Sequence, residues 1–212
     1  MTVADPMDAS GFVSVSEAVP DILLDVRYYS TYNFIGRRVD GYEQPVALLC
    51  RQAADALIPA ADRAAKLGLR LKVWDAYRPQ RAVDSFVRWV EDGSDTLMKP
   101  LFYPETEKSS FYALDFIGRR SGHSRGSAVD LTLFDTRTGT DLDMGGFFDF
   151  FGPRSRFDFE GLTPAQRENR ALLRDIMTES GFLPLEAEWW HFHLIDEPFP
   201  DTYFDFPVRW PV

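Results

Sequence analysis

The stretch Ser121-Gly-His-Ser-Arg-Gly-Ser-Ala-Val-Asp-Leu-Thr-Leu-Phe134 joins a turn to a strand. The small residues around Gly126 are typical of a turn, and apolar and polar residues then alternate up to the end of the stretch. The apolar members face one side of the predicted strand, and Asp130 faces the other. A carboxylate on a core strand needs a partner because burying an unpaired charge is costly. A metal ion is one such partner, and an arginine is another.

A second segment, Glu188-Trp-Trp-His191, completes a set of residues suited to a hydrolytic metal site. Two imidazoles and one carboxylate can occupy three corners of a zinc tetrahedron and leave the fourth for water. The sequence contains three histidines and one cysteine, so it has few ligands to offer and excludes a cysteine-rich structural zinc site. We expect His123, Asp130 and His191 to bind the metal, and Glu188 to act as general base beside the open position.

The local geometry of this second segment leaves alternatives open. The spacing of Glu188 and His191 fits a helical turn, which would put both side chains on one side. His193 is the competing ligand, because in an extended chain it shares a face with His191. We expect His193 to be a packed residue or to lie behind the ligands. Trp189 and Trp190 are either core residues or a dry wall of the site.

Ser121-x-His123-x6-Asp130 followed by Glu188-x-x-His191 resembles the signature of the zinc D-Ala-D-Ala peptidases. The likeness to the VanX-type D-alanyl-D-alanine dipeptidases extends from residue 26 to residue 207 and includes Trp74-Asp-Ala-Tyr-Arg-Pro79, Phe148-Asp-Phe-Phe151 and Asp201-Thr-Tyr-Phe-Asp-Phe206. It implies a hedgehog/DD-peptidase-like fold and hydrolysis of D-Ala-D-Ala to two D-alanine molecules. In similar enzymes this reaction removes the cell-wall dipeptide that vancomycin-type antibiotics recognise, or recycles it as a nutrient.

The resemblance also implies a role for each matching residue. His123, Asp130 and His191 match the zinc ligands, with one zinc ion per chain implied, and Glu188 matches the catalytic base. Arg78 matches an arginine that stabilises the oxyanion.

Further positions match residues that contact the substrate: Ser121, Asp149 and Tyr28. Asp149 is expected near the ammonium group of the dipeptide, and Tyr29 competes with Tyr28 for its position. Gly122 departs from the family pattern but leaves the spacing of the functional positions intact.

The sequence around Arg78 supports a functional role independently. An alternating strand is predicted over Leu69–Ala76, and Pro79 biases Arg78 toward extended geometry. A guanidinium at this place can stabilise the negative charge that develops on an attacked carbonyl. The alternative is a structural ion pair with Asp75 or Asp84.

Length and composition limit the protein class. At 212 residues and 45% hydrophobic content, the chain fits one domain with a sizeable core, and its net charge of −10 argues against nucleic acid as a partner. No apolar run approaches the roughly 18 residues of a membrane span, and the first basic residue is Arg27, so the charged start of a signal peptide is missing. We predict a cytoplasmic enzyme with a small-molecule substrate, and homo-oligomer formation stays open. Cys50 is expected to be a buried apolar residue.

The expected fold class is α+β, a small, mainly antiparallel sheet flanked by helices. A loose arm is predicted over residues 1–16, followed by a single zinc dipeptidase domain over residues 17–212. Helices are predicted over Pro45–Lys66, with Pro59 as a potential break, Arg81–Val90 and Thr163–Ser180. Strands are predicted over Leu69–Ala76, Ala128–Phe134 and Phe192–Ile195. The charged run 167–170 is expected to be a solvated helix face. The aromatic clusters at 147–151 and 203–206 could line a substrate pocket, but clustered aromatic residues are more often core, and only Asp149 is assigned to the site.

Two other functions remain open at this point. A DD-carboxypeptidase or endopeptidase would act on longer peptidoglycan stems and would be expected to carry an export signal. A zinc-bearing binding module on a hedgehog-like fold would require neither Glu188 nor Arg78, because binding alone needs no base and no oxyanion partner.

Overall fold

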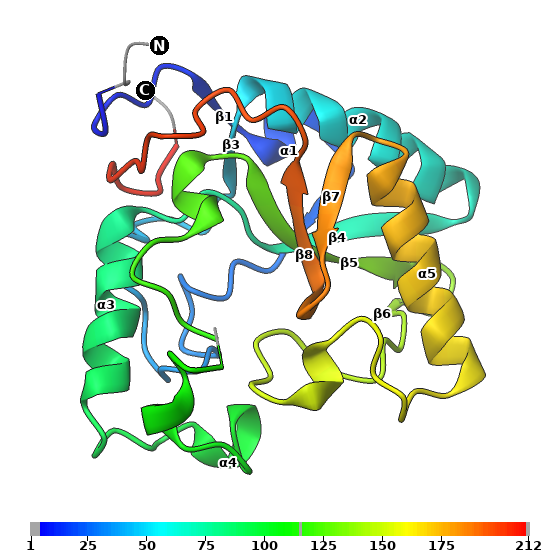
Figure 1. Cartoon of the computed structure of the whole chain (residues 1–212). Coiled ribbons are helices and arrows are strands. Elements are labelled where there is room, and N and C mark those ends of the chain that lie inside the picture. Colours follow the sequence, from blue (N-terminus) through cyan, green and yellow to red (C-terminus); the bar gives the residue numbers. More distant parts are fainter. Residues whose placement is uncertain (1–4, 115, 211–212) are drawn as a thin grey trace.

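The alternating stretch after Gly126 forms β5 (Ala128–Asp135), the central strand of the main sheet in this computed structural model (Figure 1). The structure describes residues 5–114 and 116–210. The other strands are β1 (Phe12–Ser14), β2 (Leu23–Leu24), β3 (Leu48–Cys50), β4 (Leu69–Asp75), β6 (Thr140–Asp141), β7 (Phe182–Leu185) and β8 (Glu188–Leu194). The helices are α1 (Val15–Ala18), α2 (Arg51–Lys66), α3 (Gln80–Glu91), α4 (Lys99–Phe102) and α5 (Pro164–Thr178).

The main sheet has the strand order β2-β4-β5-β8-β7, with β6 paired to the end of β5. β5 runs antiparallel to both of its long neighbours, β4 and β8, and β7 and β8 form an antiparallel hairpin. Only the short β2 runs parallel to its partner within the described residues of this sheet. The prediction of a small, mainly antiparallel sheet is confirmed.

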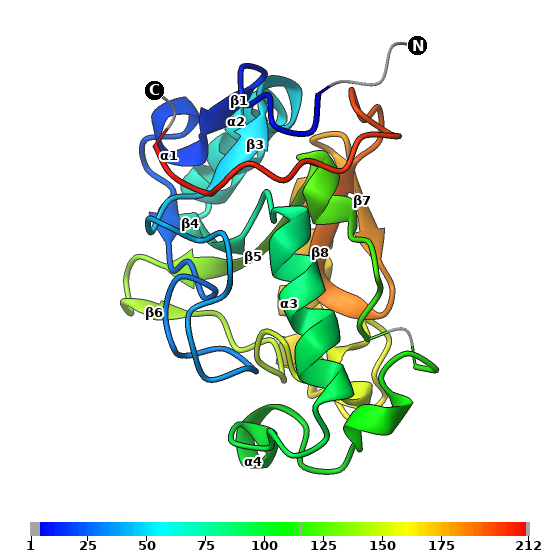
Figure 2. The ribbon, with the colours of Figure 1, turned by 90° about the vertical axis from the view of Figure 1, so that its left-hand side faces the viewer.

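The helices lie on different sides of this sheet. α2 packs against β4, α5 packs against β7, and the two helices also contact each other. α3 lies on the opposite side of the molecule from α5 (Figure 1) and passes in front of β5 and β8 in the view of Figure 2. The α+β class predicted from the sequence is confirmed. Within residues 5–114 and 116–210, no helix is long and apolar enough to cross a membrane.

The first long helix is shorter than predicted and is not broken. The prediction of helix from Pro45 is wrong up to Cys50, because Leu48–Cys50 pairs with β1 as a strand. Pro59 lies inside α2, where a proline costs about 3 kcal/mol through its missing N–H and its steric clash. Five apolar side chains of this helix are buried against the sheet side, and we infer that this packing outweighs the cost.

The N-terminal segment is more ordered than the sequence suggested. The loose arm predicted over residues 1–16 is wrong for Phe12–Ser14, which form β1, and for Val15, which is buried in α1. The reason is the Phe12 ring, which packs against four other aromatic rings: Tyr77, Phe199, Phe204 and Phe206. Residues 1–4 of the predicted arm lie outside the described part of the chain.

α5 begins as predicted but carries a buried arginine. Thr163 caps the helix, since its hydroxyl accepts the backbone N–H of Gln166 while the Gln166 side chain accepts the backbone N–H of Thr163. The run 167–170 is not entirely a solvated face, because Arg170 is only 1% exposed. Its guanidinium donates to three backbone oxygens of the loop between β6 and α5: Met144 at 2.6 Å, Arg156 at 2.5 Å and Arg154 at 2.7 Å.

Cys50 stands at the end of β3 and at the start of α2, and it is fully buried. Its backbone N–H donates to the carbonyl of Gly126 at 2.8 Å, and its Sγ lies 3.4 Å from the hydroxyl of Ser127. Burial raises the pKa of the thiol. As expected from the sequence, this cysteine is a buried core residue.

Candidate metal centre and active site

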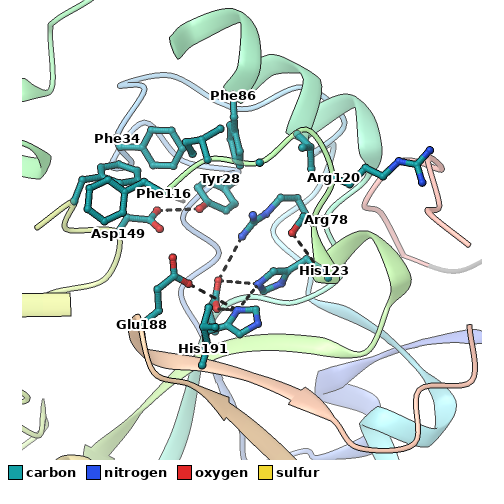
Figure 3. Close-up of a pocket in the computed structure, with 18 residues that line it drawn as sticks. Tyr28, Phe34, Arg78, Phe86, Phe116, Arg120, His123, Asp149, Glu188 and His191 are labelled. Carbon is teal, nitrogen blue, oxygen red and sulfur yellow. Dashed lines mark hydrogen bonds and ion pairs between the residues drawn. The ribbon is translucent and has the colours of Figure 1, made fainter. Parts of the chain in front are cut away.

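The predicted ligands meet at one end of the sheet, beside the turn before β5 (Figure 3). Asp130 on β5 is paired directly with His191 on β8, and the Oδ1 of Asp130 lies 3.0 Å from Nδ1 of His191. Nε2 of His123, from the 3-10 turn Gly122–Arg125, lies 3.2 Å from Asp130 Oδ2 and 3.0 Å from His191 Nδ1. One potential ligand atom from each residue lies within 4.8 Å of the others, so the three side chains could hold a metal ion.

Backbone groups fix the ring of His123. Its Nδ1 lies 2.6 Å from the carbonyl of Ala76, which can only accept, so Nδ1 carries the proton and Nε2 offers a lone pair to the site. Ser121 caps the turn, because its hydroxyl accepts the backbone N–H of His123 at 3.3 Å. Gly126 ends the turn with a φ of 79°, and a Cβ there would collide with the Phe12 ring.

Glu188 reaches the site from a strand and not from a helical turn. It is the first residue of β8, directly after the hairpin turn, and its Oε2 lies 3.9 Å from Nδ1 of His191. The helical-turn prediction was wrong because Glu188-Trp-Trp-His191 is extended. Glu188 and His191 nevertheless point into the same space (Figure 3), since the side-chain alternation is interrupted where Trp189 and Trp190 are both buried.

The electrostatic environment separates the carboxyl groups of the site. Burial raises the pKa of Glu188 to about 7, against the opposing effect of His191. Burial alone would also raise the pKa of Asp130, but the imidazoles of His123 and His191 outweigh it and hold that pKa far below its usual range. Asp130 is therefore ionised, as a metal ligand must be, whereas Glu188 can take up and release a proton near neutral pH.

Arg78 forms an ion pair and also lines the cavity. Its Nε donates to Asp75 Oδ2 at 2.8 Å, and its Nη2 lies 3.4 Å from Asp130 Oδ2. The structural ion pair with Asp75 is therefore present, but the guanidinium also borders the cavity beside the ligands. Asp84, the other proposed partner, instead accepts a hydrogen bond from Gln80.

Asp149 is presented by a strained backbone. Its φ of 62° lies in the left-handed region, which is costly for any residue with a Cβ, although aspartate and asparagine adopt it more often than most. The hydroxyl of Tyr28 donates to Asp149 Oδ2 at 2.9 Å, so these two side chains face the cavity together (Figure 3). Burial, and then the charge of Asp130, raises the pKa of Asp149 well above its usual range. Tyr29, the competitor of Tyr28, does not line the cavity.

The side chains enclose a cavity of about 260 Å³. Its polar lining includes all of the predicted site residues: Tyr28, Arg78, Ser121, His123, Asp130, Asp149, Glu188 and His191. Apolar side chains close the rest: Phe34, Val83, Phe86, Phe116, Ile117, Phe151 and Leu185. Most of these walls, and Arg120 at the rim, were missed by the sequence reasoning, because single aromatic residues scattered along a chain carry no local signal.

Neither the tryptophan pair nor His193 belongs to this cavity. Trp189 and Trp190 are buried and pack against each other and against Trp74 or Phe148, so the core interpretation is the correct one. The His193 ring centroid lies 6.3 Å from that of His191, on the same face of β8. It is not part of the potential metal-binding group.

Carboxyl groups gather around the three predicted ligands. Among the described residues, four carboxyl groups surround the buried guanidinium of Arg78: Asp75, Asp130, Asp149 and Glu188. Buried charges require compensation. Two imidazole nitrogens and a carboxylate oxygen are a donor set that suits a divalent cation such as zinc.

Comparisons with known proteins agree with this chemistry. A family model described as D-ala-D-ala dipeptidase, of the M15 peptidases, matches residues 8–209. The chain is 43% identical over 199 residues to a D-alanyl-D-alanine dipeptidase of Enterococcus faecalis, covering 94% of this chain and 98% of the relative. It is 43% identical to the D-alanyl-D-alanine dipeptidase of Streptomyces coelicolor (93% and 98% covered) and 35% identical to that of Escherichia coli (88% and 86% covered).

The comparison with solved structures finds a more distant likeness. A mutant of the vancomycin resistance D,D-pentapeptidase VanY, in complex with Zn(II), matches with a TM-score of 0.43 and 14% identity, covering 74% of this chain and 78% of that one.

Proposed function

Because the chain belongs to the D-Ala-D-Ala dipeptidase family of M15 peptidases, as its sequence predicted, we propose that it hydrolyses D-Ala-D-Ala to two D-alanine molecules. The observation that carries the proposal is the group His123, Asp130 and His191 facing Glu188 across one small cavity. Three ligands with a carboxyl group beside them are typical of a catalytic metal site, since a structural site has four protein ligands.

Zinc is the metal that we propose for these ligands. A bound zinc ion would supply Lewis-acid chemistry, which polarises a peptide carbonyl and makes a water molecule more acidic. His123 would bind through Nε2, because its Nδ1 is committed to the carbonyl of Ala76. Asp130 and His191 complete the set, and His193 stays outside it.

Glu188 is the proposed general base. It would take the proton from the attacking water and later deliver it to the leaving amine, which requires a carboxyl group that titrates near the working pH. The pKa of about 7 that burial gives to Glu188 fits this task. Arg78, whose Nη2 borders the ligands, would stabilise the negative charge on the carbonyl oxygen of the tetrahedral intermediate.

The remaining polar side chains are proposed to hold the dipeptide. Asp149, on the far side of the cavity from the ligands in Figure 3, would pair with the free ammonium group, and Tyr28 would hold the Asp149 carboxyl in place. Ser121 lines the cavity beside His123 and would contact the substrate. The cavity of about 260 Å³ is small, which favours a dipeptide over a longer stem peptide.

The test of this function compares three substrates: D-Ala-D-Ala, its N-acetyl form and a muramyl pentapeptide. Acetylation removes the charge that Asp149 would bind, and the loss of a buried charge contact costs about 2–5 kcal/mol, or roughly 30- to several-thousand-fold in kcat/KM. We expect cleavage of the free dipeptide and nearly none of the other two. Comparable turnover of the pentapeptide would instead support a carboxypeptidase, and zinc-loaded protein that cleaves none of them would support a binding module.

A further inference from the structure

Arg78 depends on a carboxylate that does not itself reach the cavity. Asp75 on β4 is paired directly with Asp130 on β5, so two buried carboxylates stand opposite each other in the sheet. Like charges in this position repel each other. The guanidinium of Arg78 lies within 2.8 Å of Asp75 and 3.4 Å of Asp130, and it therefore compensates both. Its direction is set mainly by the shorter contact, that to Asp75.

Asp75 is in turn held by a tyrosine. The hydroxyl of Tyr42 donates to Asp75 Oδ1 at 2.5 Å, and both residues are nearly fully buried, at 2% and 1% exposure. The other oxygen, Oδ2, accepts from Arg78 and lies 3.6 Å from Nδ1 of His123. Each oxygen of Asp75 thus has a partner, so the carboxylate cannot rotate without losing a charge-assisted hydrogen bond.

The backbone around Tyr42 is anchored from the C-terminal side. Tyr42 forms a parallel β-bridge with Val208, whose backbone N–H donates to the carbonyl of Gly41 at 2.8 Å. The Tyr42 ring packs edge-on against Tyr28, with ring centroids 5.6 Å apart. Its hydroxyl is therefore delivered to Asp75 by a rigid segment. Neither Tyr42 nor Asp75 lines the cavity, so neither can touch a substrate.

We propose that Tyr42 and Asp75 are a positioning pair, which fixes the guanidinium of Arg78 in the orientation needed for the oxyanion. The proposal rests on the dipeptidase function and extends it to two residues behind the site. Without the Tyr42 hydroxyl, Oδ1 of Asp75 is left unpaired and the carboxylate can turn away from Arg78. The loss then falls on the transition state, which carries the negative charge, and not on the neutral carbonyl of the ground state.

Tyr42→Phe tests the pair with little change in shape. We expect kcat/KM for D-Ala-D-Ala to fall about tenfold with KM nearly unchanged, as one charge-assisted hydrogen bond predicts. The affinity for a phosphinate dipeptide, whose charged oxygen imitates the tetrahedral intermediate, should fall by the same factor. Tyr77→Phe is the matched control, because Tyr77 is equally buried and its hydroxyl donates to the carbonyl of Phe206 at 2.9 Å, outside the cavity.

Asp75→Asn is a second, stronger variant, which keeps an oxygen for Tyr42 but removes the charge that holds Arg78. It should lower the phosphinate affinity more than Tyr42→Phe does. The positioning role is overturned if Tyr42→Phe behaves like Tyr77→Phe in phosphinate affinity, or if folded Asp75→Asn protein binds the phosphinate as the parent does.

A measurement on metal-free protein separates this proposal from the dipeptidase function. Because Nε–H of Arg78 donates to Asp75, its NMR signal, assigned by its loss in Arg78→Lys, should exchange slowly with solvent in the parent and in Tyr77→Phe. It should exchange faster in Tyr42→Phe. Equal exchange in all three would refute the positioning pair even if the enzyme is active. Faster exchange would support the pair even if the wild-type protein failed to cleave D-Ala-D-Ala.

Discussion

The proposed chemistry of this site depends on single side chains, and Glu188 is the clearest case. Its carboxyl group stands 3.9 Å from Nδ1 of His191, close enough to act beside the ligands but outside the group of three that can hold a metal. Its raised pKa of about 7 follows from burial. Removing the charge without changing the shape should therefore abolish the proton transfer and leave the metal in place.

Glu188→Gln is predicted to lower kcat at least ~100-fold while zinc stays bound, since the amide cannot accept the proton. Steady-state kinetics measure the fall in kcat, and metal analysis of the same sample measures the bound zinc. Glu186→Gln is the control, because Glu186 lies in the same hairpin turn but is exposed and pairs with Arg174. Loss of zinc from the Glu188→Gln variant alone would show that Glu188 is a ligand and not the base.

At the level of whole elements, the loop between β6 and α5 governs how Asp149 is presented. The loop contains an aspartate with a φ of 62°, and a strained residue persists only where the surroundings hold it. Arg170 on α5 donates to three backbone oxygens on either side of Asp149 in this loop, and we infer that these bonds help to hold it. Its removal would leave these oxygens buried and unpaired.

Arg170→Gln is accordingly expected to destabilise the protein by about 3 kcal/mol, which for a domain of this size lowers Tm by roughly 6–12 °C. KM should also rise, because the support of Asp149 weakens. Thermal unfolding and kinetics measure the two effects. Arg167→Gln, on the exposed side of the same helix, should change neither, and an Arg170→Gln protein with parental Tm would contradict the assigned role.

The same elements show what the sequence can and cannot predict. β5 was readable because apolar and polar residues alternate, and α5 because Thr163 and Gln166 form a local capping box. Glu188-Trp-Trp-His191 was misjudged as a turn of helix because in a regular strand a spacing of three puts two side chains on opposite faces. The sequence did not indicate that the alternation would be interrupted at Trp189 and Trp190. Arg170 was misjudged because its partners lie 14 to 26 residues away, beyond any local pattern.

The sequence predicted the polar residues of the cavity better than the apolar residues that form its walls. Every predicted polar site residue lines the cavity, since motif spacing constrains them, while their metal-binding and catalytic roles stay predictions. The sequence did not indicate any role for Tyr42. Its contact with Asp75 spans 33 residues and depends on the anchoring of residue 42 by Val208, so it could be found only in three dimensions.

Over the whole molecule, a bound metal would join three separate elements: the turn before β5, β5 itself and β8. A ligand that binds only the folded state stabilises it by about 2.7 kcal/mol at 100 times its Kd. We expect about one zinc per chain in purified protein and a fall in Tm of roughly 5–11 °C, with loss of activity, when a strong chelator removes it.

Two variants identify the third ligand in that experiment. His191→Ala should abolish zinc binding, and the chelator should then no longer lower Tm. His193→Ala should still bind zinc, and its Tm should still fall when the chelator removes the zinc. Stoichiometric zinc in the His191→Ala protein would transfer the ligand role to His193. Full activity in rigorously metal-free protein would end the proposal of a metal-dependent hydrolase.

The reaction rate of the buried Cys50 thiol can report how often the surrounding structure opens. The only cysteine of the chain is sealed between the end of β3 and the segment that leads into β5, so a thiol reagent can reach it only when this region opens. The colour released by a disulfide reagent should therefore develop slowly in native protein and at once in guanidinium. Saturating zinc, at about 100 times its Kd, should slow it up to a further ~100-fold. The rate of the thiol reaction therefore reports how often the turn that carries His123 opens, and the measurement needs no introduced label.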